Sequence, residues 1–386
     1  MKERVIALYL PQFHPIPEND LWWGKGFTEW TNVGRAHPLF KGHYQPRVPA
    51  DLGYYDLRLQ EVREAQVELA KEAGVEGFCY YHYWFGGGKQ LLERPFNEVV
   101  KSGKPDFPFC LCWANHSWSN RTWEQNVSKV KPQMLMEQKY GGVEDYKAHF
   151  ENLLPAFRDK RYMTIDDKLI FVIYDPFSFT DVSNFMCVWR ELAKKNSIRD
   201  FFFIAMTPAI LNTRLAENGK REHILPDLAS SEKLYQSVID FGFDGINSFG
   251  KRRGEILYRG YLRESFEHIL KRFHLNVGIT KYDYERVVDN FFPPEDSWEN
   301  VFPTILPQWD RTPRVGKAEG VYVNSTPEKF KKHAKHAFDL IKGKKEEHRI
   351  VFLKSWNEWA EGNYIEPDLK YGHGYIQALR QAIEES

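Results

Sequence analysis

The chain has 386 residues, which is long for one average domain and within the range of a single barrel with insertions. Hydrophobic residues make up 42% of the sequence, enough for a sizeable core, and aromatic residues make up 16%. Lys and Arg together number 53, as do Asp and Glu, so the formal net charge is zero. We expect no nucleic-acid partner, because the basic footprint that such a partner requires is missing.

Apolar runs that are typical of buried strands alternate with segments of helical periodicity. The predicted strands span residues 5–10, 77–83, 107–113, 169–174, 201–206, 245–248, 301–308 and 350–355, and the clearest helices span 58–73, 181–195, 258–273, 327–341 and 374–383. This pattern predicts an α/β fold, a (β/α)8 TIM barrel that residues 1–386 form as one domain. A doubly wound sheet is the alternative, and it is disfavoured because no Gly-x-Gly-x-x-Gly follows any strand.

Three long segments, 11–55, 208–232 and 249–300, interrupt this alternation. The first is rich in Trp, Gly, Pro and His. Loops of this length inside a compact domain are usually functional. We expect them to be insertions in the loops after the strands, at the face of the barrel where those loops gather.

The cysteine content and the N-terminus predict a reducing compartment. Cys79, Cys110 and Cys112 lie in predicted buried strands, and their spacing fits neither a zinc ribbon nor a redox pair. Free buried thiols are therefore expected. The apolar run 5–10 is too short for a secretory leader, and no stretch approaches membrane-spanning length. A cytoplasmic protein with no membrane span is predicted.

The segment 355–367, which follows the last predicted strand, is the most informative part of the chain. It places three carboxylates, Glu358, Glu361 and Glu366, among aromatic residues and Asn357. Glycoside hydrolysis needs two carboxyl groups that flank a sugar. Acidic residues after a strand also cap helices or lie in solvent, and a Glu-x-x-Glu pair alone is weak evidence. The aromatic residues, which are costly to expose, favour a site.

Polar and aromatic residues also follow most of the other predicted strands, whose C-terminal ends converge in a barrel. Planar polar groups bind vicinal hydroxyls, and aromatic faces cover the C–H faces of a sugar ring. We therefore predict these substrate-binding residues: His14, Glu29, Trp30, Tyr81, His82, Trp84, Trp113, Asn115, Tyr174, Asp175, Asn247, Trp309, Asp310, Asn357, Trp359 and Glu366. Packing or turn formation is the alternative for each one. For His14 and His82, each taken alone, a core histidine is the better interpretation.

Metal and cofactor chemistry are not expected. His14, His82 and His116 could meet in the cleft and hold zinc, but no closely spaced histidine pair supports this. Neither a Gly-x-Ser-x-Gly nucleophile elbow nor a phosphate-binding loop is present in the sequence.

Several long motifs resemble those of the WbsX-like family. They lie at residues 5–14, 26–33, 51–56, 78–84, 113–115 and 308–314, so the resemblance covers essentially the whole chain. Members of this family are often labelled glycosyltransferases and are associated with bacterial surface-polysaccharide loci. The family is in turn similar to glycoside hydrolase family 99, the endo-α-mannosidases and mannanases, which are (β/α)8 barrels. That second link rests on the fold and on the motifs at 357–362 and 365–367.

The resemblance to family 99 implies a retaining α-glycoside hydrolase that acts on a mannose- or rhamnose-containing glycan. By motif position, Glu358 would be the general base and Glu361 the general acid/base. The base would deprotonate the sugar 2-hydroxyl, which attacks C1 while the acid protonates the leaving oxygen. Water would then open the resulting 1,2-anhydro sugar. The sequence departs from the family pattern at Ala360, where many members are expected to have His.

Two other functions compete with this one. A glycosyltransferase in lipopolysaccharide, O-antigen or capsular polysaccharide biosynthesis would need a diphosphate site, usually Asp-x-Asp with a metal or a basic clamp. No Asp-x-Asp follows a predicted strand. A non-catalytic carbohydrate-binding barrel would keep the aromatic residues without needing both Glu358 and Glu361. Each function has an oligosaccharide or polysaccharide as its partner.

Overall fold

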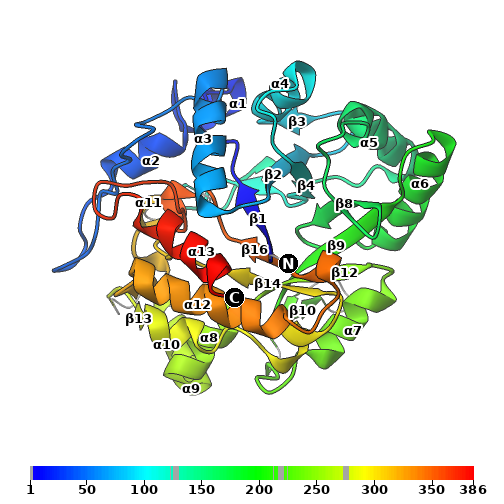
Figure 1. Cartoon of the computed structure of the whole chain (residues 1–386). Coiled ribbons are helices and arrows are strands. Elements are labelled where there is room, and N and C mark those ends of the chain that lie inside the picture. The colour runs from blue at the N-terminus through cyan, green and yellow to red at the C-terminus, as the bar shows by residue number, and fades with distance from the viewer. Residues whose placement is uncertain are drawn as a thin grey trace.

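A closed barrel of parallel strands is the centre of the molecule. The computed structural model describes residues 3–121, 123–124, 130–211, 213–215, 221–223, 225–272 and 278–386. Within them, eight parallel strands form the barrel: β1 (Arg4–Tyr9), β2 (Gly77–Trp84), β4 (Phe109–Trp113), β8 (Lys168–Ile173), β9 (Phe201–Pro208), β12 (Gly245–Phe249), β14 (Val301–Ile305) and β16 (Ile350–Leu353). They follow one another around the barrel in chain order (Figure 1).

The barrel closes because its first strand pairs with both the second and the last. Val5 of β1 is in register with Val351 of β16, and Ala7 of β1 is in register with Phe78 of β2. The strands are nearly continuous apolar runs, as expected where both faces of a parallel sheet are covered. The predicted (β/α)8 barrel is confirmed, and closure excludes the doubly wound sheet.

Helices between the strands form the outer layer. They include α3 (Gln60–Ala73), α4 (Arg94–Ser102), α5 (Gly142–Phe157), α6 (Val182–Lys195), α7 (Glu232–Asp240), α12 (Pro327–Ile341) and α13 (Gly374–Glu384). The last helix, α13, packs against both α3 and α12 (Figure 1), so the two ends of the chain are joined in the helical layer as well as in the sheet. The start of α12 has Pro327 in its first turn and Thr326 as its N-cap, whose hydroxyl accepts a hydrogen bond from the backbone N–H of Lys329.

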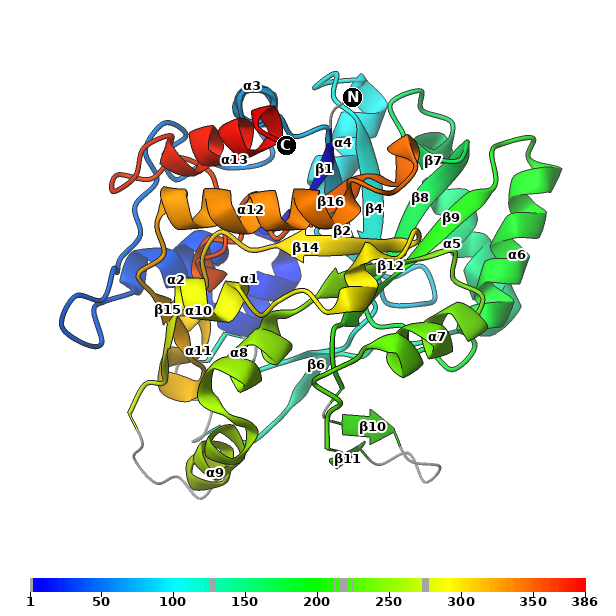
Figure 2. The ribbon, with the colours of Figure 1, turned by 60° about the horizontal axis from the view of Figure 1, so that its bottom comes forward.

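The long insertions follow the C-terminal ends of the strands. They contain α1 (Pro17–Trp23), α2 (Glu29–Arg35), β3 (Gln90–Leu91), β5 (Trp118–Ser119), β6 (Met134–Met136), β7 (Thr164–Ile165), β10 (Thr213–Leu215), β11 (Arg221–His223), α8 (Lys251–Arg259), α9 (Tyr261–Arg272), β13 (Lys281–Asp283), α10 (Tyr284–Val288), α11 (Thr312–Val315) and β15 (Val321–Val323). Of these, only the short β7 lies just before a barrel strand instead, because it pairs antiparallel with the start of β8. Figure 2 shows β6, the β10–β11 hairpin and α9 on the same side of the molecule.

Several element boundaries differ from the sequence prediction, and three of the differences affect the course of the chain. The predicted helix 258–273 is two helices, α8 and α9, separated at Gly260, whose φ of 87° breaks the helical path. The predicted strands 301–308 and 350–355 end earlier, at Ile305 and Leu353. In both cases the residues beyond the strand leave the sheet and turn into the loops described below.

The four cysteines are free thiols. Cys79, Cys110 and Cys112 are buried in the barrel strands, as predicted, and Cys187 is exposed. Among the helices that the structure describes, none combines the length and the apolar character needed to cross a membrane.

Aromatic residues fill the layer between the barrel and its helices. Trp189 of α6 is fully buried, and its ring lies 4.7 Å from that of Phe171, 5.2 Å from Phe201 and 5.0 Å from His149. Rings of this size bury large apolar areas and so dominate the packing energy of such a layer. The α5–α6 side of the barrel therefore depends on Trp189.

Truncation of this ring tests the packing. We expect Trp189→Ala to lower the free energy of unfolding by about 3–5 kcal/mol, because it leaves a cavity that the rigid barrel cannot close. Urea denaturation measures the change. The matched control is Leu262→Ala, at a side chain that is 84% exposed, with an expected change within about 0.5 kcal/mol. Equal effects of the two substitutions would contradict this account of the core.

Candidate active site

The chain after β16 folds back on itself and presents two glutamates. The backbone N–H of Ser355 donates to the carbonyl of Asn363 over 2.6 Å, and the N–H of Ile365 donates to the carbonyl of Trp356 over 3.1 Å. The Ser355 hydroxyl also accepts a hydrogen bond of 2.9 Å from the backbone N–H of Glu358. These bonds close residues 355–365 into a tight loop at the C-terminal end of the strand.

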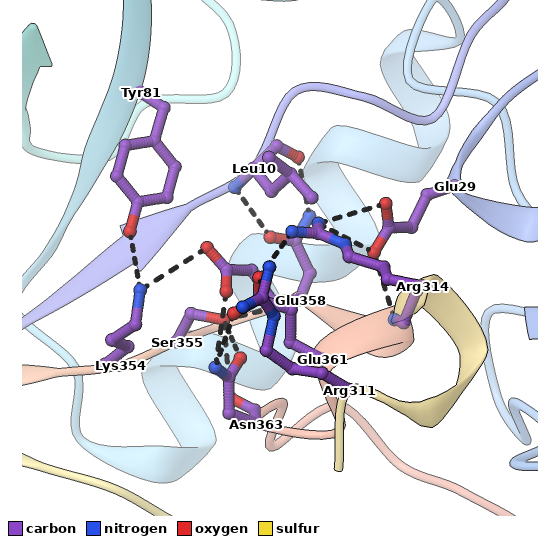
Figure 3. A network of polar contacts seen from close by, with 12 residues as sticks. Leu10, Glu29, Tyr81, Arg311, Arg314, Lys354, Ser355, Glu358, Glu361 and Asn363 are labelled. Atoms are coloured by element: carbon purple, nitrogen blue, oxygen red, sulfur yellow. Dashed lines mark hydrogen bonds and ion pairs between the residues drawn. The ribbon is translucent and has the colours of Figure 1, made fainter. Parts of the chain in front are cut away.

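Glu358 and Glu361 lie side by side in this loop (Figure 3). Their exposed fractions are only 4% and 7%. The side-chain amide of Asn363 lies 3.2 Å from one oxygen of Glu358 and 3.5 Å from one oxygen of Glu361, so a single N–H₂ group bridges the two carboxylates. The two carboxyl groups therefore point toward the same amide group.

Two arginines of the loop after β14 hold Glu361. Arg314 of α11 donates to a carboxylate oxygen of Glu361 over 2.5 Å, and the Nε atom of Arg311 lies 3.0 Å from the same oxygen. Such charge-assisted contacts strongly favour the ionised carboxylate. Burial acts to raise the pKa of Glu361, but the two guanidinium groups outweigh burial and hold its pKa well below the usual range.

Glu358 has a weaker cationic partner. The Nζ atom of Lys354 lies 3.7 Å from Glu358 and donates to the hydroxyl of Tyr81 over 3.1 Å (Figure 3). Burial raises the pKa of Glu358, the negative charge of Glu361 raises it further, and Lys354 opposes both without cancelling them. The pKa values of the two neighbouring carboxyl groups are thus shifted in opposite directions, and Glu358 is the one that more readily carries a proton.

Glu29 ties the first insertion to the same cluster. This first residue of α2 is completely buried, and its two oxygens lie 3.1 and 3.2 Å from one nitrogen of Arg314. It also accepts a hydrogen bond of 3.0 Å from the backbone N–H of Ala360, between the paired glutamates. Burial raises the pKa of Glu29 to about 7 against the pull of Arg314.

The cations and the bridging amide were not predicted from the sequence. Arg311, Arg314, Lys354 and Asn363 all contact the glutamate pair. A physical signal for the cations exists, because buried carboxylates require cationic partners. The arginines lie in the predicted motif 308–314, and Lys354 lies at the end of a predicted strand. Sequence alone does not tell which of the 53 basic residues would fill this role.

Several predicted residues pack around the glutamate loop. The amide of Asn357 exchanges hydrogen bonds of 2.8 and 3.0 Å with the backbone of Leu10, which fixes the loop to the end of β1. The Trp359 ring lies 5.4 Å from Trp30, and its N–H donates to Glu366 over 2.6 Å. Trp359 is itself buried, so its faces meet other rings.

Glu366 belongs to a buried network behind the loop. It accepts hydrogen bonds from Tyr55 over 2.9 Å and from Gln66 of α3 over 2.6 Å, besides the one from Trp359. Burial raises the pKa of Glu366 to about 7, although these three donors act to lower it. These contacts account for the buried Glu366 carboxyl group as a support for the loop, and no ligand is needed to explain it.

Three of the predicted substrate-binding residues lie instead on the outer side of the barrel: His82, Trp84 and Trp113. The ring nitrogen Nε2 of His82 is 2.8 Å from Nε2 of His149 on α5, the Trp84 ring stacks on His149 at 4.7 Å, and Trp113 meets it edge-on at 4.8 Å. Side chains alternate along a strand, so these residues face the helices while Tyr81 faces inward. Burial lowers the pKa of His82 to about 3, consistent with the core-histidine interpretation.

Further along the barrel rim, local hydrogen bonds hold other predicted residues. One carboxylate oxygen of Asp310 contacts Nε2 of His43 at 2.8 Å and accepts from the amide of Gln45 at 2.7 Å. The Asn115 amide accepts from the backbone N–H of Asp175 over 2.7 Å and donates to its carbonyl over 2.8 Å. Asp310 therefore joins the first insertion to the loop after β14, and Asn115 joins the ends of β4 and β8.

The remaining predicted residues have partners within the barrel or its loops. Asn247 donates to the Thr304 hydroxyl over 2.8 Å, and the Trp309 ring lies 4.5 Å from the ammonium group of Lys251. Tyr174 packs edge-on against Tyr81 with 6.2 Å between ring centres. His14 lies 3.1 Å from the carbonyl of Pro11, and burial lowers its pKa to about 4.

Within the described residues, no group of three or more His, Cys, Asp or Glu side chains could hold a metal ion.

The fold is shared with solved glycoside hydrolase structures. A glycoside hydrolase-like protein superposes with a TM-score of 0.57 at 14% identity, covering 99% of this chain and 94% of the other. The family 99 endo-α-mannosidase from Bacteroides thetaiotaomicron, in complex with BIS-TRIS-propane, superposes with a TM-score of 0.54 at 14% identity, covering 99% and 97%. At this identity the likeness concerns the fold alone, the (β/α)8 barrel.

The sequence comparisons define the family. The model of the family described as glycosyltransferase WbsX matches residues 5–379, and the chain belongs to this family. Two proteins named uncharacterized protein WxcX, from two strains of Xanthomonas campestris pv. campestris, are 32% identical over 387 and 380 residues. Each match covers 98% of this chain and 49% of the relative, so the chain spans about half the length of these curated relatives. The resemblance inferred from the motifs is confirmed.

Removal of Arg314 tests the charge cluster. Arg314→Met takes away the guanidinium that both oxygens of Glu29 contact. We expect a loss of about 3–5 kcal/mol in the free energy of unfolding, because a buried carboxylate is left unpaired. Addition of Glu29→Gln should recover part of this loss in a double-mutant cycle measured by urea denaturation. Arg199→Met is the control, in an exposed pair where about 0–1 kcal/mol is expected. Strict additivity of the two buried substitutions would refute the coupling.

The raised pKa of Glu366 predicts that this residue contributes to stability in a pH-dependent way. Its pKa in the folded state, about 7, is above the ordinary value of 4.5, so the unfolded state ionises first as the pH rises. Its contribution is therefore complete below pH 4.5 and is lost as the pH rises through 7. We expect the stability of the wild type, minus that of Glu366→Gln, to fall between pH 5 and pH 8 in urea titrations. A difference that rises with pH would mean that the three donors dominate over burial.

Proposed function

We propose that this chain is a retaining α-glycoside hydrolase that acts on a mannose- or rhamnose-containing glycan, with residues 1–386 as one catalytic barrel domain. The observation that carries the proposal is the pair Glu358 and Glu361, buried together, bridged by one amide and held in unlike charge environments. Carboxyl groups whose surroundings push their pKa values apart are the usual mark of an acid and its ionised partner.

The unlike charge environments of the two glutamates suggest which one acts as base and which as acid. Glu361, held ionised by Arg311 and Arg314, suits the group that takes the proton of the sugar 2-hydroxyl. Glu358, whose pKa is raised, suits the group that protonates the leaving oxygen. This order is the reverse of the one that motif position in family 99 implies. We propose it for the resting site, whose arginines disfavour a proton on Glu361.

In the proposed first step, the two glutamates exchange all the protons that the reaction moves. The 2-hydroxyl oxygen attacks C1 and passes its proton to Glu361, while the bond from C1 to the leaving oxygen breaks and that oxygen takes the proton of Glu358. In the second step, water attacks C1 of the 1,2-anhydro sugar and gives a proton to Glu358. The bond from C1 to the epoxide oxygen breaks, and this oxygen, which becomes the 2-hydroxyl, regains its proton from Glu361. Two inversions at C1 retain the configuration. Each glutamate reverses its role between the two steps, as microscopic reversibility requires.

A glycosyltransferase is the second candidate, favoured by the cations Arg311, Arg314 and Lys354 around the pair. A diphosphate leaving group is commonly held by such a basic clamp. In the structure, however, each of these cations already contacts a carboxyl group of Glu29, Glu358 or Glu361. The clamp is thus occupied by carboxylates, which favours a neutral glycan over a nucleotide sugar.

We propose a cytoplasmic location, as the sequence predicts. The buried thiols Cys79, Cys110 and Cys112 and the exposed thiol Cys187 are all free. Free thiols persist where the environment is reducing. Substrates in that compartment would be imported oligosaccharides or lipid-linked intermediates.

Replacement of either glutamate tests the hydrolase. On a panel of α-mannosides and α-rhamnosides, in EDTA and without nucleotide sugar, we expect Glu358→Gln and Glu361→Gln each to lower kcat about 10²–10⁴-fold while the folded structure is kept. Glu68→Gln, at an exposed glutamate of α3, is the matched control and should keep wild-type turnover. No release by the wild type, together with transfer when a nucleotide sugar is added, would establish the second candidate instead.

Leaving-group dependence separates the two roles. An aryl glycoside with a strongly acidic phenol needs little protonation of its leaving oxygen, so the variant that lacks the acid recovers activity on it. We expect this recovery in Glu358→Gln and not in Glu361→Gln. Recovery in Glu361→Gln alone would restore the order of roles that the family motif implies.

A further inference from the structure

A pocket of about 290 Å³ lies next to the glutamate loop and is lined by neither glutamate. Its walls come from the first insertion, from β15 and the turn before α12, and from the segment just before α13, and its lining includes Asp310 and Gln308 from the loop after β14. We name it the rim pocket.

The floor of the rim pocket is polar and buried. Arg47 donates to the amide oxygen of Gln308 over 2.6 Å, and both side chains are more than nine-tenths buried. The Gln308 Nε2 atom and the Ser325 hydroxyl are also buried, with no hydrogen-bond partner in the described structure. Unpaired buried polar groups cost free energy, and such groups in a native structure call for a ligand or a water molecule. Here they border an open pocket.

The walls are aromatic. The rings of Tyr44 and Tyr371 meet at an angle of 88° with 6.2 Å between their centres, and Phe40 lies parallel to the ring of His43 at 4.4 Å. The ammonium group of Lys370 lies 4.5 Å from the Tyr44 ring and 4.7 Å from the Tyr371 ring. Two aromatic rings therefore line the pocket together with the hydrogen-bonding groups of its floor, and the Lys370 ammonium lies over part of each ring.

The charges of the floor largely cancel, and the ammonium group of Lys370 adds a positive charge in the wall. Asp310 contacts His43 and Gln45 and lies 3.9 Å from a guanidinium nitrogen of Arg47. A floor in which the anion and the cation are already paired suits a neutral ligand with hydroxyl groups. The volume is at the lower end of the range of roughly 300–1,000 Å³ for small-molecule sites, which suits one ring and not a chain.

The rim pocket and the glutamate loop touch through the backbone. The N–H of Asp310 donates to the carbonyl of Glu361 over 2.7 Å. A Cβ atom added to Gly362 would lie 2.9 Å from Cβ of Asp310 and 3.1 Å from Cζ of Arg47, so only glycine fits at this contact. The floor of the rim pocket is thus packed directly against the loop that carries the pair.

We propose that the rim pocket binds one neutral pyranose ring, as a sugar-binding site distinct from the glutamate pair. Tyr44 and Tyr371 would cover the C–H faces of the ring, and Gln308 and Ser325 would donate to its oxygens. The class of ligand, a glycan unit, rests on the proposed function. The location of the site and its size, which suits a single ring, rest on the geometry of the pocket.

Ligand-observed NMR tests the proposal without any turnover. Saturation transfer to methyl α-mannopyranoside and methyl α-rhamnopyranoside is measured with the wild type and four variants. We expect binding of at least one of the two that persists in Glu361→Gln, weakens about tenfold in Tyr44→Ala and weakens less in Ser325→Ala. The control is Phe266→Ala, at a ring that is 60% exposed, which should bind as the wild type does. Ser325→Ala removes only a hydroxyl and so guards against a misfolded Tyr44→Ala.

The outcomes separate this proposal from the hydrolase. Binding that disappears in Glu361→Gln and survives in Tyr44→Ala and Ser325→Ala would overturn the rim pocket, as would no binding of either glycoside to the wild type. Hydrolysis by the wild type with no Tyr44-dependent binding would keep the enzyme and reject the pocket. Tyr44-dependent binding without any hydrolysis would keep the pocket and reject the proposed enzyme.

Discussion

The contact of Arg314 with two carboxylates is the interaction on which the candidate site depends. Glu29 comes from the insertion after β1, Glu361 from the loop after β16, and Arg314 from the loop after β14. All three are buried, and a carboxylate without a cation would be too costly at these positions. One guanidinium group therefore brings three separate loops of the barrel to a single place (Figure 3).

The same cation also makes the paired glutamates unequal. Two neighbouring carboxyls in equal surroundings would compete for one proton, and neither would have a fixed role. Arg311 and Arg314 contact Glu361, whereas Glu358 has only the more distant Lys354. Arg314 thus both assembles the site and makes the surroundings of the two glutamates unequal. An Arg-to-Lys exchange at 314 would lose both, since a single ammonium cannot match the spread of guanidinium donors.

The sequence predicted the barrel well because apolar runs and helical periodicity are local properties. It also placed Glu358 and Glu361 in one loop, since only two residues, Trp359 and Ala360, separate them. It could not say which face of β2 turns inward, so His82 and Trp84 were grouped with Tyr81 although they lie on opposite faces. The partners of the carboxylates were missed for another reason. Arg314 and Glu29 are 285 residues apart, and only the closed barrel brings them together.

Closure of the barrel by its first and last strands has a consequence for biosynthesis. On the ribosome, β1 must wait for β16 before its second edge is paired, and Glu29 must wait for Arg314. A nascent chain that has left the ribosome only as far as α12 therefore has neither a closed sheet nor a glutamate pair. The candidate site can form only after the last strand has emerged, so incomplete chains lack it at every earlier stage of synthesis.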